Sequence, residues 1–407
     1  MNRVFEFNLI GYWLKKPNQV LGIFLFAAIF MAYMFDFARF SVANAQETPA
    51  TSAPTSNLGQ ELVQQVRGCV QAKFANSTTK KPEISALAMQ CTYEVVILNK
   101  DGSVRVDASD RINAMFVATG AKVPLPVSKG TSTNIKMGYL PQSRVFTVPV
   151  TIAGKTNSFL LDTGASSSII NSETAKQLQL PGNPIPGDVL KYMGVGNNCT
   201  KVQATVHQLP AITVNSVSVS GLNGLGLSPN SIPGKTAGVL GLDFLSQFDM
   251  LVNPKQQQLK LLSPSKLTTS AIPLQGKLGA MIVEVQVNGK GPFKFLLDTG
   301  ADVMVLSHPL AKQLGINNLQ AKKTDVEGFC GIEKAREIKL NQFSLQQHQA
   351  TKLDAVILES DGLFNMLGIQ GIVGQNFLNK YQQHWRFGER NPLGFPNNGS
   401  LVLTPVK

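Results

Sequence analysis

Two stretches of the sequence are identical: Phe159-Leu160-Leu161-Asp162-Thr163-Gly164-Ala165 and, 136 residues later, Phe295-Leu296-Leu297-Asp298-Thr299-Gly300-Ala301. Of the 22 residue pairs aligned from Phe159 and Phe295, 11 are identical, far more than chance gives in unbiased sequence. Alternating apolar residues precede each copy and predict strands that end in a Gly turn. The chain therefore contains two copies of one β-rich unit, at about residues 143–264 and 272–405.

The aspartate in each copy follows an apolar strand, where an unpaired carboxylate is costly. The Gly two residues later permits a tight turn whose amide can donate to that carboxylate. A single Asp-Thr-Gly is also an ordinary turn. Here both copies keep the acid, and an apolar-apolar-Gly segment follows 76–79 residues later, at Leu240-Gly241 and Val373-Gly374. This pairing favours a functional role.

With these motifs the chain resembles the pepsin/retropepsin superfamily of aspartic proteases over residues ~143–405. Both copies look like the short retropepsin type, fused into one chain. The resemblance implies a mainly β, bilobal acid protease fold in which Asp162 and Asp298 form the catalytic dyad. Beneath the dyad the threonines would interlock, and the glycines would contribute amides to the carboxylates. These supporting residues are Thr163, Gly164, Thr299 and Gly300.

The resemblance also implies flaps that close over a bound substrate. They would fall near residues 192–198 in the first copy and 327–331 in the second. The candidate flap residues are Tyr192, Gly194, Gly196, Gly328 and Gly331.

Four cysteines in an exported chain permit two disulfides and three pairings. Cys69 and Cys91 belong to one small unit, so a bridge between them is expected. Cys199 and Cys330 lie 37 and 32 residues after their aspartates and can bridge the two flap regions; two separate thiols are the alternative. No CxxC spacing occurs and the four His are isolated, so we expect no metal site and no cofactor.

The N-terminal segment has the pattern of an export signal. Arg3, Lys15 and Lys16 precede the apolar stretch 20–35, and Ala43-Asn44-Ala45 has a small-x-small pattern. Residues 1–45 are therefore interpreted as a hydrophobic helix, either a cleaved signal peptide or a retained membrane anchor. Both interpretations place the remainder outside the cytoplasm. In a bacterium this is the periplasm or the outer face of the membrane.

Between this segment and the repeats we expect a polar linker (46–57), a small α+β domain (58–123) and a second linker (124–142). Helical spacing of apolar residues predicts a helix from residue 58, and strands are expected at 93–98 and 104–106 around an Asp-Gly turn. This domain has no counterpart in the resemblance. It can be an inhibitory prodomain, a docking module or a spacer.

Composition excludes several other classes. The chain has 407 residues, 43% hydrophobic and 15% charged, which argues against disorder and coiled coils. The net charge of +12 is scattered rather than gathered in a basic run, so nucleic-acid binding is not expected.

The leading hypothesis is an exported or membrane-anchored aspartic endopeptidase that acts as a monomer on peptide or protein substrates. It would touch a membrane only through an uncleaved N-terminal segment. The alternatives are a non-catalytic peptide-binding envelope protein and an autoprocessing sensor on the same fold.

Overall fold

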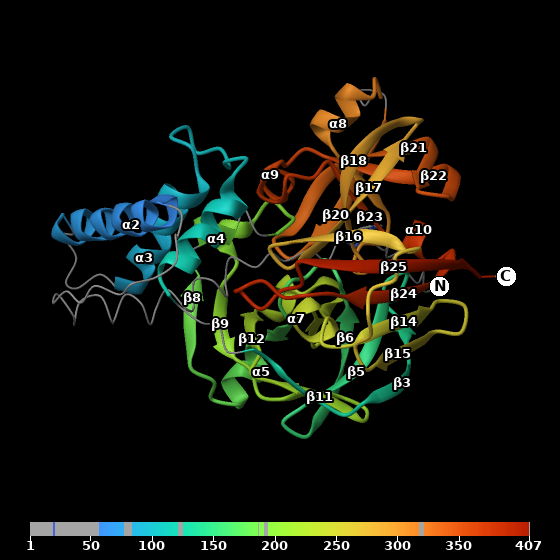
Figure 1. Cartoon of the computed structure of the whole chain (residues 1–407), viewed down its shortest axis with the longest axis horizontal. Coiled ribbons are helices and arrows are strands. Elements are labelled where there is room, and N and C mark those ends of the chain that lie inside the picture. The colour runs from blue at the N-terminus through green and yellow to red at the C-terminus, as the bar shows by residue number, and fades with distance from the viewer. Residues whose placement is uncertain are drawn as a thin grey trace, which may run out of the picture.

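Two β-rich lobes and a small helical unit make up the computed structural model, which describes residues 19–20, 57–76, 84–120, 125–185, 187–190, 194–316 and 321–406. In Figure 1 the lobes lie one above the other, and the helical unit lies at one side, next to both. The mainly β, bilobal fold predicted from the repeats is confirmed.

The two lobes repeat the same arrangement of strands. In each lobe, the strand that leads to the Asp-Thr-Gly motif pairs in parallel with the strand of the apolar-apolar-Gly segment. This segment also pairs antiparallel with the strand that follows the motif. A fourth strand pairs in parallel with the strand that follows the motif. The strands of the first lobe are β5 (Phe146–Ile152), β6 (Lys155–Leu161), β7 (Ile169–Asn171), β12 (Asn223–Leu227) and β13 (Gly238–Leu240). Those of the second are β17 (Ala280–Val287), β18 (Lys290–Leu297), β19 (Met304–Ser307), β22 (His348–Leu358) and β23 (Gly371–Val373).

Each lobe also has a β-hairpin that is not part of this repeated arrangement of strands. In the first lobe β8 (Gly182–Ile185) pairs with β9 (Ala204–Gln208), and the chain between them is long. In the second lobe β20 (Lys322–Gly328) pairs with β21 (Gly331–Leu345) through a tight turn. Strands β10 (Ile212–Val214) and β11 (Val217–Ser220) complete the outer sheet of the first lobe.

An antiparallel part of a 14-stranded sheet joins the two lobes, and we call this part the shared sheet. Within it β14 of the first repeat pairs with β24 of the second, and Met250 lies opposite the fully buried Trp385. Because neither lobe can unfold without opening this sheet, it fixes their relative position. Its strands are β3 (Ser132–Lys136), β15 (Gln258–Leu262), β14 (Asp249–Asn253), β24 (Tyr381–Phe387), β25 (Asn398–Pro405) and β16 (Ile272–Lys277).

Short helices follow corresponding strands in the two lobes. Asn171 and Ser307 accept a hydrogen bond from the first turn of α5 and α8, as N-caps do. The helices are α5 (Ser172–Gln177), α6 (Gly187–Leu190), α7 (Leu242–Leu245), α8 (His308–Gln313), α9 (Gly362–Leu367) and α10 (Gln375–Leu378).

The small unit is helical, so the α+β prediction for residues 58–123 is wrong. It consists of α2 (Asn57–Ala75), α3 (Ile84–Thr92), a π-helical turn (Tyr93–Ile97) and α4 (Ala108–Ala118). The strand expected at 93–98 continues α3 instead, because Tyr93, Val96 and Ile97 are buried against the neighbouring helices. Of the expected hairpin only one antiparallel bridge forms, between Leu98 and Val104.

The segment 124–142 is not the plain linker that was expected. It contributes β2 (Val127–Lys129), which pairs with β11, β3, which pairs with β15, and β4 (Gly138–Tyr139), which pairs with β5. The alternating burial of β3 shows that one of its faces points into the core, where Ile135 belongs to an apolar cluster.

Most of the N-terminal segment and of the linker at 46–57 lies outside the described residues, including the expected hydrophobic helix. The described pair Gln19–Val20 forms β1, which pairs in parallel with β20 opposite Val326 and Glu327. Among the residues that the structure describes, no helix is long and apolar enough to span a membrane.

Candidate active site

The repeats bring Asp162 and Asp298 together at the junction of the lobes. Each follows the end of a parallel strand pair, and its amide donates to the carbonyl of Leu240 or Val373, at 3.2 and 3.1 Å. A Cβ added to Gly164 would lie 2.5 Å from Cγ of Asp298, and one on Gly300 would overlap Asp162 in the same way. Only glycine therefore lets the two carboxyl groups lie side by side across the junction.

Backbone amides hold one oxygen of each carboxylate. Oδ1 of Asp162 accepts from the amides of Gly164 and Ala165 at 2.8 and 3.0 Å. Oδ1 of Asp298 accepts from Gly300 at 2.7 Å. Oδ2 of both aspartates is buried and accepts no hydrogen bond from any other residue in the described part of the chain. The two groups are within hydrogen-bonding reach of each other, so a shared proton can join them.

The two threonines interlock beneath the dyad, as expected. Thr163 Oγ1 donates to the carbonyl of Leu297 at 3.0 Å, and Thr299 Oγ1 donates to that of Leu161 at 2.9 Å. Each hydroxyl also accepts from the backbone amide of the other threonine, at 2.9 and 3.1 Å. Four buried hydrogen bonds thus cross between the lobes and fix the spacing of the aspartates.

Burial raises the pKa of both acids. The pKa of Asp162 rises to about 7, although hydrogen bonds from Asp298 and two amides act in the opposite direction. The pKa of Asp298 is raised well above its usual value, first by burial and then by the charge on Asp162. The arrangement therefore favours one proton shared by the pair. Asp162 is the better stabilised as the charged partner, because its Oδ1 accepts from two amides and that of Asp298 from one.

The flap candidates that the structure describes lie together. Gly328 and Gly331 bound the turn between β20 and β21, whereas Gly194 and Gly196 lie in the connection between β8 and β9. Tyr192 lies outside the described residues. The second hairpin also reaches the first lobe, because the carboxylate of Glu327 accepts a hydrogen bond from the amide of Gly234.

Both disulfides are formed, with Cys69 joined to Cys91 and Cys199 joined to Cys330. The first ties α2 to α3, and the second ties the two flap regions to each other. The alternative of separate thiols is therefore wrong.

Neither carboxyl group of the dyad is open to solvent in this structure. Asp162 and Asp298 are both 0% exposed. One apolar cluster contains Ala165 and Ala301 from the two motifs and Val195 and Phe329 from the two flap regions, and it extends to Phe116 of α4. A substrate can reach the carboxylates only when some of these side chains move.

A third buried acid, Asp243, supports the site and was not singled out from the sequence. Its carboxylate accepts from the amide and the hydroxyl of Ser168, and that hydroxyl accepts from the amide of Gly241. Burial raises the pKa of Asp243 to about 6. An acid inside the apolar run at 238–245 is the signal that would have found it, and Asn376 takes the corresponding place in the second lobe.

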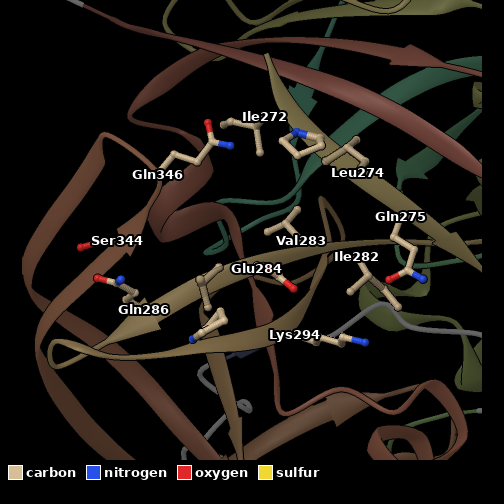
Figure 2. A pocket seen from close by; sticks show the side chains of 13 residues that line it. Ile272, Leu274, Gln275, Ile282, Val283, Glu284, Gln286, Lys294, Ser344 and Gln346 are labelled. Atoms are coloured by element: carbon tan, nitrogen blue, oxygen red, sulfur yellow. The ribbon is translucent and has the colours of Figure 1, made fainter. Parts of the chain in front are cut away.

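Among the described residues, one pocket and one cluster of possible metal ligands lie outside the two motifs. A pocket of about 470 Å³ lies on strands β16, β17 and β18 of the second lobe, and Glu284 and Lys294 face each other across neighbouring strands in it (Figure 2). None of its lining residues belongs to either motif. Within the part of the chain that the structure describes, Cys69, Cys91 and Glu94 lie close enough together to hold a metal ion, but the two cysteines are bonded to each other in a disulfide.

One family model matches both repeats. A family model described as "gag-polyprotein putative aspartyl protease" matches residues 148–247 and again residues 283–380. Each matched segment lies within one repeat and contains its motif. Among solved structures, a retropepsin-like aspartic protease from Rickettsia conorii aligns with a TM-score of 0.25 and 20% identity, covering 33% of this chain and 100% of that chain. The comparison with curated proteins found no match.

Proposed function

The chain belongs to the retropepsin/pepsin superfamily of aspartic proteases through both of its repeats, and we propose that it is an endopeptidase with Asp162 and Asp298 as its catalytic residues. The observation that carries the proposal is the buried pair of carboxyl groups, each held by amides at Oδ1 and open at Oδ2. One chain supplies both aspartates, which supports activity as a monomer.

The chemistry follows from the protonation of the pair. Asp162, as the charged partner, takes a proton from a water molecule, and the water oxygen bonds to the scissile carbonyl carbon. Asp298 donates its proton to the carbonyl oxygen, which gives a neutral tetrahedral diol. Asp162 then returns its proton to the amide nitrogen while Asp298 takes a proton from one diol hydroxyl. The C–N bond breaks, which releases an amine and a carboxylic acid and restores the starting protonation of the pair. The interlocked threonines hold the two acids at the spacing that these transfers need.

Two further features belong to the proposal. Two disulfides suit an oxidising compartment, which supports export of residues 46–407 by the N-terminal segment, whether that segment is cleaved or retained. The pairing of β1 with β20 indicates that an extended segment can add to the edge of the second flap hairpin. This observation also favours the second candidate function, a peptide-binding protein that works by strand addition without cleavage.

Substitution of the aspartates separates these two candidates. We expect Asp162→Asn and Asp298→Asn each to lower kcat/KM on a mixed peptide library by at least about a thousandfold, because neither variant has both a base and an acid. A statine-type inhibitor should block the unmodified protein. Circular dichroism checks that the variants fold.

Retention of cleavage in the Asn variants would contradict the assignment of the dyad. Peptide binding without cleavage by the unmodified protein would support the second candidate instead.

A further inference from the structure

The two flap regions are joined by covalent and hydrogen bonds. Cys330 lies in the turn between β20 and β21, and Cys199 begins a short 3-10 helix (Cys199–Lys201) between β8 and β9. Their disulfide brings the Cα atoms to 4.5 Å. The amide of Cys330 donates to the carbonyl of Val195 at 2.9 Å, and the amide of Asn198 donates to the carbonyl of Cys330 at 3.0 Å.

The backbones of the two regions are in direct contact at this junction. A Cβ on Gly196 would lie 2.6 Å from the carbonyl oxygen of Cys330, and one on Gly328 would overlap the carbonyl of Val195. Cys199 and Cys330 are 4% and 1% exposed. We call this joined segment, Val195–Cys199 with Gly328–Gly331, the flap arch. It is a packed connection between the lobes.

The flap arch and the two motifs pack in one buried apolar cluster. Val195, Phe329 and Cys330 belong to the same apolar cluster as Ala165 and Ala301, the residues that directly follow the two Gly of the motifs. A peptide that reaches the carboxylates must therefore lie between the arch and the motif strands.

The disulfide also closes a covalent ring around that space. Residues 199–330 and their bridge form a closed loop that contains Asp298. The same loop contains β13, which pairs in parallel with the strand that leads to Asp162. The ring thus includes Asp298, the strand beside the one that leads to Asp162, and the part of the arch formed by Cys199 and residues 328–330. A peptide bound between the arch and the motif strands has to pass through this ring.

We propose that the Cys199–Cys330 bridge turns the cleft into a closed tunnel, so that the enzyme cleaves only chains that enter by a free end. Linear, unfolded polypeptides and short peptides can thread through the ring. A cyclic peptide cannot, because two closed rings do not interlock unless one of them is opened. A chain segment between two folded domains is excluded because neither folded domain can pass through the ring. This inference rests on the proposed endopeptidase function.

A pair of substrates that differ only in topology tests the inference. The best-cleaved linear peptide from the library is embedded in a sequence of about 24 residues. A ring of this length can still present a segment of ~8 residues in extended form to the site. The same sequence is then closed head to tail through an amide bond. For the unmodified protein we expect kcat/KM on the cyclic form to be at least about a hundredfold below that on the linear form.

Opening the arch should restore cleavage of the cyclic peptide. In the Cys199→Ser/Cys330→Ser variant we expect the cyclic-to-linear ratio of kcat/KM to rise at least about tenfold. Cys69→Ser/Cys91→Ser is the matched control, which removes a disulfide outside the ring and should keep the low ratio. If the arch variant does not fold, a phosphine reductant applied to the control variant opens the same bridge. Cleavage of the linear peptide reports in each case that the protein is folded.

The outcomes are distinct. Cleavage of the cyclic peptide by the unmodified protein at a rate near that of the linear one would overturn the tunnel and leave the endopeptidase function intact. Equal cyclic-to-linear ratios with and without the bridge would also overturn it, because ring strain in the substrate would then explain the difference. If no form cleaves either peptide, the proposed function fails, and this inference fails with it.

Discussion

Asp162 and Asp298 are ionisable groups without solvent exposure, and this determines how they respond to pH. In the unfolded chain each titrates at ~3.9, whereas burial raises the folded pKa of Asp162 to about 7 and raises the folded pKa of Asp298 well above its usual value. Between these values the folded state binds more protons than the unfolded state. Stability is therefore greatest below the unfolded pKa and is lost as the pH rises through the folded values.

The Asp162→Asn variant has one acid in the dyad instead of two. We expect the melting temperature of the unmodified protein to fall more steeply from about pH 5 to 8 than that of the variant, so that their difference shifts by several degrees. Scanning calorimetry at each pH measures this. Asp101→Asn is the control, since Asp101 lies in an exposed turn and hydrogen bonds from Ser103 lower its pKa. Its difference from the unmodified protein should stay flat in this range, and parallel curves for Asp162→Asn would contradict the expectation.

At the scale of elements, the repeats are alike but their contacts across the junction differ. Arg144, just before β5, donates through its amide to the buried carboxylate of Asp302 at 2.7 Å, and its guanidinium lies 3.6 Å away. In the corresponding contact Gly279, just before β17, packs against Ser166. An ion pair on one side of the pseudo-twofold axis is thus replaced by a close contact between small residues on the other.

Because of this close contact, we expect Gly279→Ala to lower the free energy of unfolding more than the positive φ of Gly279 alone would cause. Gly279 and Gly289 have similar positive φ values, +76° and +73°, so alanine is strained at both. At Gly279 the new Cβ would also lie 2.5 Å from Cβ of Ser166, whereas nothing lies within 4 Å at Gly289. We expect Gly279→Ala to lower the free energy of unfolding by about 1–3 kcal/mol more than Gly289→Ala. Urea unfolding of both variants measures the difference, and equal losses would show that the junction adjusts freely.

Elements set by local pattern were predictable, and elements set by packing were not. The alternating residues before each motif and the repeated Asp-Thr-Gly-Ala were sufficient to predict the lobes and the place of the dyad. The run Tyr93–Ile97 has the composition of a strand, but burial against α2 and α4 makes it helical. Strand β3 was missed because its polar sequence gains stability only from β15, more than 100 residues away in the chain.

The burial of the site likewise depends on packing and could not be predicted from local sequence pattern. The spacing of Cys199 and Cys330 indicated a bridge between the flap regions. It did not show that Val195 and Phe329 close the space above both aspartates, because that depends on side chains from both lobes packing together.

On the scale of the whole molecule, three kinds of bonding hold the lobes together. The shared sheet pairs β14 with β24, the threonine hydroxyls cross the junction beneath the dyad, and the flap arch joins the lobes above it. The site is therefore enclosed from both sides by interlobe contacts. Of the three, only the arch is covalent.

The two disulfides should differ in their contribution to stability because they close loops of very different length. Cys199–Cys330 spans 131 residues and Cys69–Cys91 spans 22. In the chain-entropy description these loops correspond to about 5 and ~3 kcal/mol of stabilisation. We expect the urea midpoint to fall further in Cys199→Ser/Cys330→Ser than in Cys69→Ser/Cys91→Ser. Fluorescence of Trp385, buried in the shared sheet, reports unfolding of the joined lobes. The reverse order of midpoints would show that the small helical unit, rather than the arch, limits the stability of the molecule.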